Sequence, residues 1–335
     1  MKIRIDYLLL RLILGRRYRE KTWANKRDMV ESQNLILVSS TPVLADVCKL
    51  EPVKYHIDAD YPCFNPSIIG TDNGYKLISR SSNLVTLNDE KFVRKCLPNE
   101  TVNYLVDLDH DLNVIGQCRL DDRLIRQPGA VAEYGIEDCR LFKWNQSVWL
   151  CGAANHPLGK NRLGVKQVLC KLEDNSIIEA KTIESPHNRP VEKNWAPIAL
   201  DDELALVYSL SPVEIVRVKG STITYDRSDR RIDTEFKLRG GTPFIRWNNI
   251  FLGVAHSQPL RYQGKIYYLH YFISMNEELE LLETSQPFFI QRKGIEFATG
   301  IEVTDNGILL SYGVADRTGR LIKIPNQVIE KYITI

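Results

Sequence analysis

The sequence lacks a long hydrophobic run. Its most apolar stretch near the start, residues 7–14, is interrupted by Arg11 and falls far short of the ~20 residues that a membrane-spanning helix needs. No small-residue cleavage site follows this stretch, and basic residues continue after it, so it is also a poor match to a secretory signal. The sequence therefore predicts neither a membrane-spanning helix nor a secretory signal here.

The cysteines and histidines show no pairing pattern. The seven cysteines are scattered singly, without a Cys-x-x-Cys motif, and the six histidines show no metal-ligand spacing. An odd number of dispersed cysteines is typical of reduced, buried thiols and not of a disulfide framework or a zinc site. We therefore expect a cytoplasmic protein with neither disulfides nor a bound metal.

Glycine-rich phosphate loops and the nucleophile motif of α/β-hydrolases are missing too. The chain has no Walker motif, no Gly-x-Gly-x-x-Gly and no Gly-x-Ser-x-Gly, and the pair Gly240-Gly241 is too short to form a phosphate loop. The net charge of +2 gives no general case for nucleic-acid binding. We expect no cofactor and no nucleic-acid partner.

Charge is unevenly distributed along the chain. Residues 1–27 contain nine Lys and Arg against Asp6 and Glu20, a balance of +7, which leaves about −5 for the remainder. A basic and apolar start can rest on an anionic membrane surface, at the inner face of the membrane for a cytoplasmic protein. The alternative is a terminal strand or helix that docks on the domain with its cations in water. We predict a basic N-terminal extension over residues 1–50.

What the sequence does contain is a recurring hairpin pattern. Two apolar runs rich in strand-forming residues flank an Asn-, Asp- or Gly-rich turn in five segments, 64–83, 137–156, 192–211, 240–259 and 299–318. Further strand-like runs lie between the segments, and few stretches show a helical period. Repeated units of this kind predict an all-β fold, a five-bladed β-propeller over residues 51–335, with two-layer β-sandwich repeats as the alternative.

Polar residues gather at the same end of all five hairpins. In a propeller these ends would surround one axis and form a central funnel-shaped active site. The clusters could also be ordinary solvated loops, but that would not explain why all five flank the same pair of strands. Amides, acids and cations in fixed directions suit the hydroxyl groups of a sugar, and the planar guanidinium of arginine matches phosphate geometry.

Short motifs in a fixed order resemble glycoside hydrolase family 130. They are Asn65-Pro66 followed by Arg80, Glu137-Asp138-x-Arg140, Lys193-Asn194, Gly240-Gly241 before Thr242-Pro243, and Tyr312-Gly313-x-Ala315-Asp316, which together span residues 64–318. The family consists of five-bladed propellers, mostly β-mannoside phosphorylases, with related β-1,2-mannosyltransferases. The resemblance therefore implies the same fold and mannosyl chemistry.

The resemblance also implies roles for individual residues. Asp138 matches the general acid of the family's Glu-Asp-Pro-Arg motif. The candidates for sugar contacts are Asn65, Arg80, Glu137, Asn194, Trp195, Tyr312 and Asp316. The candidates for binding the phosphate or the donor are Arg140, Lys193, Arg239 and His256. For Trp195, packing in the core is an equally weighted alternative, and His270, which lies in an apolar strand, is expected to be a core residue.

Two departures from the family pattern bear on the activity. Cys139 stands where the family has proline, and Glu192-Lys193-Asn194-Trp195 is closer to the transferase-like relatives. We therefore predict an inverting glycosyltransferase that joins a mannosyl donor such as GDP-mannose to a mannoside or glycan acceptor through a β-mannosidic bond, with β-1,2 as one option, in the synthesis of a surface glycan or oligomannoside. The alternatives are a β-mannoside phosphorylase that releases mannose 1-phosphate and, ranked lower, a non-catalytic carbohydrate-binding propeller.

The protonation state of Asp138 separates these activities. Strict alternation along the strand would place Asp138 and Arg140 on one face, both directed towards the site. A nearby cation lowers the pKa of a carboxyl group, whereas burial raises it. The sequence leaves the balance between these two effects open.

Overall fold

The turns that join the first two strands of the hairpins follow directly from local sequence. Asn145 and Gln146 both have positive φ between the paired residues Trp144 and Ser147, and the Asn248-Asn249 pair does the same in a later hairpin. Two consecutive residues with positive φ form the two-residue turn whose twist matches that of antiparallel strands. The sequence therefore fixes strand register at these hairpins through side chains that tolerate the left-handed region.

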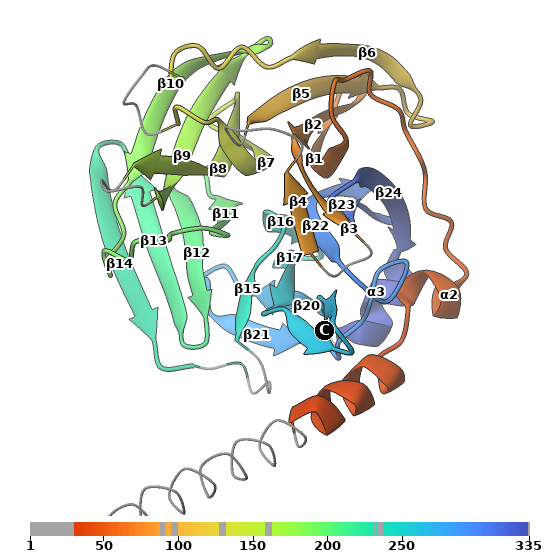
Figure 1. Cartoon of the computed structure of the whole chain (residues 1–335). Helices are drawn as coiled ribbons and strands as arrows, with labels where there is room; N and C mark the ends of the chain where they lie inside the picture. Colours follow the sequence, from red (N-terminus) through yellow and green to blue (C-terminus); the bar gives the residue numbers. More distant parts are fainter. Residues whose placement is uncertain are drawn as a thin grey trace, which may run out of the picture.

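The computed structural model describes residues 30–87, 91–94, 100–126, 132–157, 163–230, 232 and 237–333. Within these ranges, five antiparallel sheets surround a central axis (Figure 1). The predicted all-β, five-bladed propeller is confirmed, and the two-layer sandwich is not formed.

The first three blades have four strands each, and in each blade the strand that comes first in the sequence is at the axis. The first blade contains β1 (Cys63–Thr71), β2 (Gly74–Ser82), β5 (Thr101–Leu108) and β6 (Val114–Arg119). The second contains β7 (Ile136–Trp144), β8 (Ser147–Pro157), β9 (Leu163–Glu173) and β10 (Ser176–Ile183). The third contains β11 (Ala196–Ala199), β12 (Leu204–Leu210), β13 (Val213–Lys219) and β14 (Thr222–Ser228).

The last two blades depart from this scheme. The fourth contains β15 (Leu238–Gly240), β16 (Ile245–Trp247), β17 (Ile250–Ser257), β20 (His270–Met275) and β21 (Leu281–Thr284). The fifth contains β22 (Glu296–Thr304), β23 (Gly307–Val314) and β24 (Thr318–Pro325). Two short hairpins extend from the blades, β3 (Leu84–Leu87) with β4 (Lys91–Arg94), and β18 (Leu260–Tyr262) with β19 (Lys265–Tyr267).

The start of the described chain closes the ring. Val53 exchanges both backbone hydrogen bonds with Leu321 of β24, at 2.7 and 3.1 Å, so a segment that precedes the first blade pairs with the outer strand of the last. Helix α2 (Leu44–Cys48) is held by bonds from the Leu44 and Ala45 amides to the carbonyls of Phe289 and Ile290. Part of the predicted N-terminal extension thus packs on the propeller.

The helices are few and short in the described part of the chain. Residues 30–40 are helical and precede α2, and helix α3 (Asn326–Tyr332) follows the last strand. None of the helices in the described residues is long and apolar enough to cross a membrane. The predicted membrane contact through residues 1–27 lies outside the described residues.

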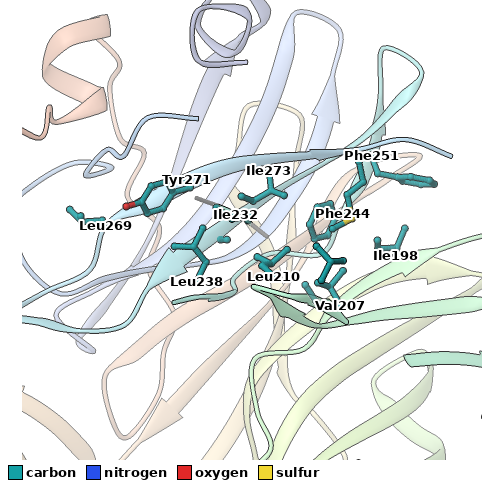
Figure 2. Packing of buried hydrophobic residues seen from close by; sticks show 14 of the residues in the cluster. Ile198, Val207, Leu210, Ile232, Leu238, Phe244, Phe251, Leu269, Tyr271 and Ile273 are labelled. Atoms are coloured by element: carbon teal, nitrogen blue, oxygen red, sulfur yellow. The ribbon is translucent and has the colours of Figure 1, made fainter. Parts of the chain in front are cut away.

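Apolar side chains fill the spaces between adjacent blades. Figure 2 shows one such cluster, in which Ile198 and Val207 of the third blade pack with Phe251 and Ile273 of the fourth. Burial of apolar area at about 25 cal/mol per Å² makes these interfaces the main source of stability. His270, predicted to lie in the core, is 0% exposed, and burial lowers its pKa to about 3, so it stays neutral.

A recurring backbone irregularity marks one end of the inner strands. Asn65 in β1, Asp138 in β7 and Asn194 just before β11 all have left-handed φ, at 48°, 50° and 65°. The pairing register shifts around Asn65 and Asp138, which identifies these positions as β-bulges. A bulge re-aims the side chain that it carries. Three adjacent blades therefore present a polar side chain at equivalent places near the axis.

Candidate functional site

A cavity of about 260 Å³ lies at this end of the inner strands. Nine of the residues predicted for the site line it: Asn65, Arg80, Glu137, Asp138, Lys193, Asn194, Arg239, His256 and Asp316. Six of them lie on strands of the first, second and fourth blades, and the other three precede β11 of the third blade or follow β23 of the fifth. The fold therefore brings together in one cavity polar residues that are up to about 250 positions apart in the sequence.

Arg80 organises the acidic side of the cavity. Its Nη1 donates to Asp138 Oδ1 at 3.1 Å and its Nη2 donates to Glu137 Oε1 at 2.8 Å, while its guanidinium lies 5.2 Å from the centre of the Phe64 ring. Asn65 Nδ2 also donates to Asp138 Oδ1, at 2.8 Å. Two donors thus converge on one carboxylate oxygen and fix the orientation of Asp138.

The two aspartates of the cavity have pKa values shifted in opposite directions. Burial opposes ionisation of Asp138, but Arg80, Asn65 and Lys193 outweigh it and lower the pKa. For Asp316, burial dominates and, with the negative charges of Asp138 and Glu137, raises the pKa to about 6 despite Arg80. Carboxyl groups driven apart in this way can serve different steps of one reaction. Asp138 is therefore ionised at neutral pH, whereas Asp316, with a pKa of about 6, titrates close to neutral pH.

A second part of the cavity lining is cationic. Lys193 precedes β11 and Arg239 lies in β15, and within the described part of the chain neither forms an ion pair. His256 in β17 is buried, and burial together with the nearby cations holds its pKa well below the usual range, so the imidazole is neutral. Its ring packs edge-on against Phe297, with 4.6 Å between centroids. Two free cations and a neutral imidazole form a suitable cradle for an anion.

Three residues predicted for the site do not line the cavity. Arg140 is 0% exposed and lies in the interior, Trp195 packs edge-on against Tyr208 at 5.0 Å, and Tyr312 is buried with its hydroxyl donating to Gln291 Oε1 at 2.8 Å. The β-bulge explains the first case, because the register shift between Glu137 and Arg140 breaks the alternation that would have placed Asp138 and Arg140 on one face.

The other two cases follow from core packing. Trp195 fills the space between the second and third blades, and Tyr312 belongs to the cluster between the fourth and fifth. Large aromatic side chains bury more apolar area there than at a polar wall. The equally weighted alternative for Trp195, packing in the core, matches its position.

Six further residues line the cavity that the sequence did not single out: Phe64, Ser257, Pro259, Tyr268, Ile295 and Phe297. Phe64 could have been found from its place beside Asn65. Tyr268 lies in the apolar run that contains His270, between β19 and β20. Its amide donates to the Gly294 carbonyl at 3.2 Å, and its ring packs edge-on against His256 with 5.7 Å between centroids. Nothing in the run distinguishes it from a core residue.

A metal centre has no counterpart in this part of the chain. Among the described residues, no group of three or more His, Cys, Asp and Glu side chains is arranged to hold a metal ion. The polar groups of the cavity are instead partly paired with one another, and Asn65 Oδ1 and His256 Nδ1 are buried without a hydrogen-bond partner among the described residues.

The position of Asn65 depends on a glycine in the neighbouring blade. A Cβ added at Gly313 would lie 1.9 Å from Asn65 Oδ1 and 2.8 Å from its backbone nitrogen. We expect Gly313→Ala to displace Asn65, remove its bond to Asp138 and lower kcat/KM by about 10²-fold, the cost of a displacement of ~1 Å at a reacting centre. Steady-state kinetics measure the effect. Gly116→Ala is the control, because its Cβ would meet only Asp107 Oδ2 at 3.5 Å, and equal losses in both variants would contradict the expectation.

No family model matches the sequence, and no curated protein sequence is similar to it. Solved structures do resemble the fold. A β-1,2-mannobiose phosphorylase from Listeria innocua aligns with 84% of this chain and 96% of its own, at a TM-score of 0.57 and 12% identity. A mannose phosphorylase from Leishmania mexicana, in complex with a phosphate ion, aligns with 85% of this chain and 90% of its own. Its TM-score is 0.50 and its sequence identity is 11%.

A third structure is described with the GH130 family of mannoside phosphorylases, which contains glycoside hydrolases that target β-1,2-mannosidic linkages in Candida mannan. It aligns with 80% of this chain and 85% of its own, at a TM-score of 0.52 and 11% identity. At these identities the likeness establishes a common fold, the five-bladed propeller.

Proposed function

We propose that the protein is an inverting glycosyltransferase that forms a β-mannosidic bond from an activated mannosyl donor such as GDP-mannose. The observation that carries the proposal is the state of Asp138, whose pKa is lowered and whose Oδ1 is held by Asn65 and Arg80. An ionised carboxylate in a cavity that also holds free cations suits a reaction needing both a base and an anion site. The mannoside-active proteins that share the fold support mannose as the sugar.

The proposed reaction assigns each side of the cavity one task. The acceptor hydroxyl attacks the anomeric carbon of the donor, a new C–O bond forms, and Asp138 takes the hydroxyl proton. The bond from the anomeric carbon to the phosphate oxygen breaks on the opposite face, and Lys193 and Arg239 stabilise the departing diphosphate. Attack opposite to the leaving group converts an α-linked donor into a β-linked product.

Further polar and aromatic residues of the cavity would recognise the sugar. Arg80 and Asp316 line the cavity with Asn65 and Asn194 and offer both donors and acceptors to hydroxyl groups. Phe64, Tyr268 and Phe297 supply apolar surface for one face of a pyranose ring. A cavity of about 260 Å³ accommodates the sugar and the adjacent phosphate, so the nucleoside of a sugar-nucleotide donor would lie beyond the cavity mouth.

A β-mannoside phosphorylase is the second candidate, favoured by the activities of two proteins that share the fold. Phosphorolysis runs the same geometry in reverse, with phosphate on the cationic side and Asp138 as the acid. An acid must be protonated at working pH, which the lowered pKa of Asp138 opposes. The transferase direction therefore ranks first. A carbohydrate-binding propeller, the third candidate, would have no need for Asp138.

A donor comparison tests the proposal. The protein is incubated with GDP-mannose or with mannose 1-phosphate, each with a panel of β-mannoside acceptors, and the release of GDP or phosphate is measured. We expect GDP release that depends on the acceptor. Product from mannose 1-phosphate alone would replace the transferase by the phosphorylase, and sugar binding without turnover, unchanged in Asp138→Asn, would leave the carbohydrate-binding propeller.

The cationic side gives a separate prediction. Lys193→Met and Arg239→Met each remove a charged hydrogen-bond donor, worth about 1.5–3 kcal/mol, so the KM of the donor is expected to rise by about 10- to 100-fold. The KM of the acceptor should change little, because the acceptor carries no anion. Lys323→Met is the matched control, since this residue lines a different pocket. Unchanged donor KM values in both variants would place the anion elsewhere.

A further inference from the structure

Arg140 is fully buried and binds residues that belong to or directly precede three blades. It follows Asp138 by two residues on β7 and is 0% exposed. Its Nε donates to the Gly241 carbonyl at 2.6 Å and its Nη1 donates to the Asp138 carbonyl at 2.9 Å. Its Nη2 is shared between the Gly240 carbonyl at 3.3 Å and Asn194 Oδ1 at 3.4 Å.

All of these acceptors are neutral, which is unusual for a buried cation. Burial lowers the pKa of Arg140, and among the described residues no carboxylate forms an ion pair with it. A buried charge is normally paired, because desolvating it costs several kcal/mol. Arg140 instead donates hydrogen bonds in several fixed directions. Two of its acceptors belong to Asp138 and Asn194, which both line the cavity and both have left-handed φ.

The glycine pair allows this convergence. A Cβ at Gly240 would lie 2.5 Å from the Asn194 carbonyl, and one at Gly241 would lie 2.4 Å from the Val254 carbonyl. Without side chains, the two glycine carbonyls of the fourth blade reach the guanidinium that the second blade supplies. The Gly240-Gly241 pair, which is too short to form a phosphate loop, thus allows two backbone carbonyls to reach Arg140.

We propose that Arg140 is a positioning residue that fixes the Asp138 bulge and the Asn194 side chain relative to one another, and that it does not bind the anionic ligand. The inference rests on the proposed function only in taking Asp138 as the proton-transfer group. A planar fork with separate Nε, Nη1 and Nη2 donors is needed to hold carbonyls from three blades in one arrangement, whereas an ammonium group supplies charge without this geometry.

The test compares Arg140→Lys with the wild-type protein in the donor assay. Lysine keeps the charge but not the fork, so we expect kcat to fall by about 10²-fold, the effect of a small misplacement of the reacting groups, with the donor KM changed by less than about threefold. If Arg140 bound the anion, the donor KM would rise while kcat was retained. If only the charge mattered, lysine would restore full kcat. Either result would overturn the proposal.

A second variant and a readout independent of activity distinguish the loss of positioning from misfolding of Arg140→Lys. Gly240→Ala keeps Arg140 but displaces the carbonyl that Arg140 binds, so it should also lower kcat. In the double variant with Arg140→Lys, the loss of kcat should differ from the combined losses of the two single variants. In the ¹⁵N spectra of either variant, the amide signals of Asp138 and Asn194 are expected to shift whether or not the protein transfers mannose. Unchanged signals at both positions would contradict the positioning role even if the transferase assay failed for other reasons.

Discussion

Asp138→Asn is expected to lower kcat by about 10²- to 10⁴-fold, the usual contribution of a general base, while the fold and the sugar affinity are retained. The substitution should preserve the local hydrogen bonds, because the amide oxygen can accept the two bonds that Asn65 and Arg80 donate to Oδ1 in the wild-type protein. The amide nitrogen replaces the other carboxylate oxygen and cannot take a proton from the acceptor hydroxyl. Initial rates at saturating donor and acceptor measure the loss.

The control for this variant is Asp305→Asn, because Asp305 lines a different pocket from the cavity that contains Asp138. It should leave kcat within about twofold of wild type, as expected of a substitution away from the reacting groups. If Asp138→Asn retained kcat to the same extent, Asp138 would not be the base, and Asp316, whose pKa is raised to about 6, would be the next residue to substitute.

Below pH 4.5, Glu296→Ala is expected to cost about 3 kcal/mol or more of unfolding free energy. The carboxylate is 0% exposed and accepts hydrogen bonds from the backbone amides of Ile290 at 2.8 Å, Gln291 at 3.0 Å and Arg292 at 3.1 Å. Alanine would leave these donors without an acceptor in the interior. They belong to the segment that ends in Ile295 at the cavity wall, so activity should fall at temperatures where this segment opens.

Urea unfolding of the wild-type protein and the variant measures this difference, with Glu330→Ala on the exposed side of α3 as the control. The pH dependence provides a further check. Burial raises the pKa of Glu296 from 4.5 to about 7, so the folded protein holds a proton that the unfolded chain releases above pH 4.5. Its contribution to stability is therefore complete below pH 4.5 and is lost as the pH rises to about 7. A Glu296→Ala protein with unchanged stability at all pH values would contradict the assigned role.

The fold could be read from the sequence because its signals are local. Asn145 and Asn248 stand in turns whose geometry favours them, and the apolar runs on either side are short and rich in strand-forming residues. Once five such hairpins surround an axis, the polar ends meet, which is why Asn65 and Asp316 lie in one cavity. The closure of the ring by Val53 left no signal, because a single bridge needs no pattern.

The detail of the site could not be predicted for a different reason. Alternation assumes a regular strand, and the bulge at Asp138 breaks it, so Arg140 lies in the interior where a regular strand would have directed it to the cavity. Tyr268 lines the cavity from the segment between β19 and β20, and nothing in the apolar run around it indicates this position. The pKa of Asp138 depends on the balance between burial and Arg80, which only three-dimensional distances determine.

We propose that Asp138 acts as a base in the transfer of a mannosyl group with inversion. NMR spectra of the wild-type protein with ¹³C-labelled GDP-mannose and a β-mannoside acceptor, recorded beside those of Asp138→Asn, provide the decisive test. We expect a new β-anomeric signal that appears together with GDP in the wild-type sample and is absent from the variant. An α-linked product, or a β-linked product formed equally well without Asp138, would contradict it.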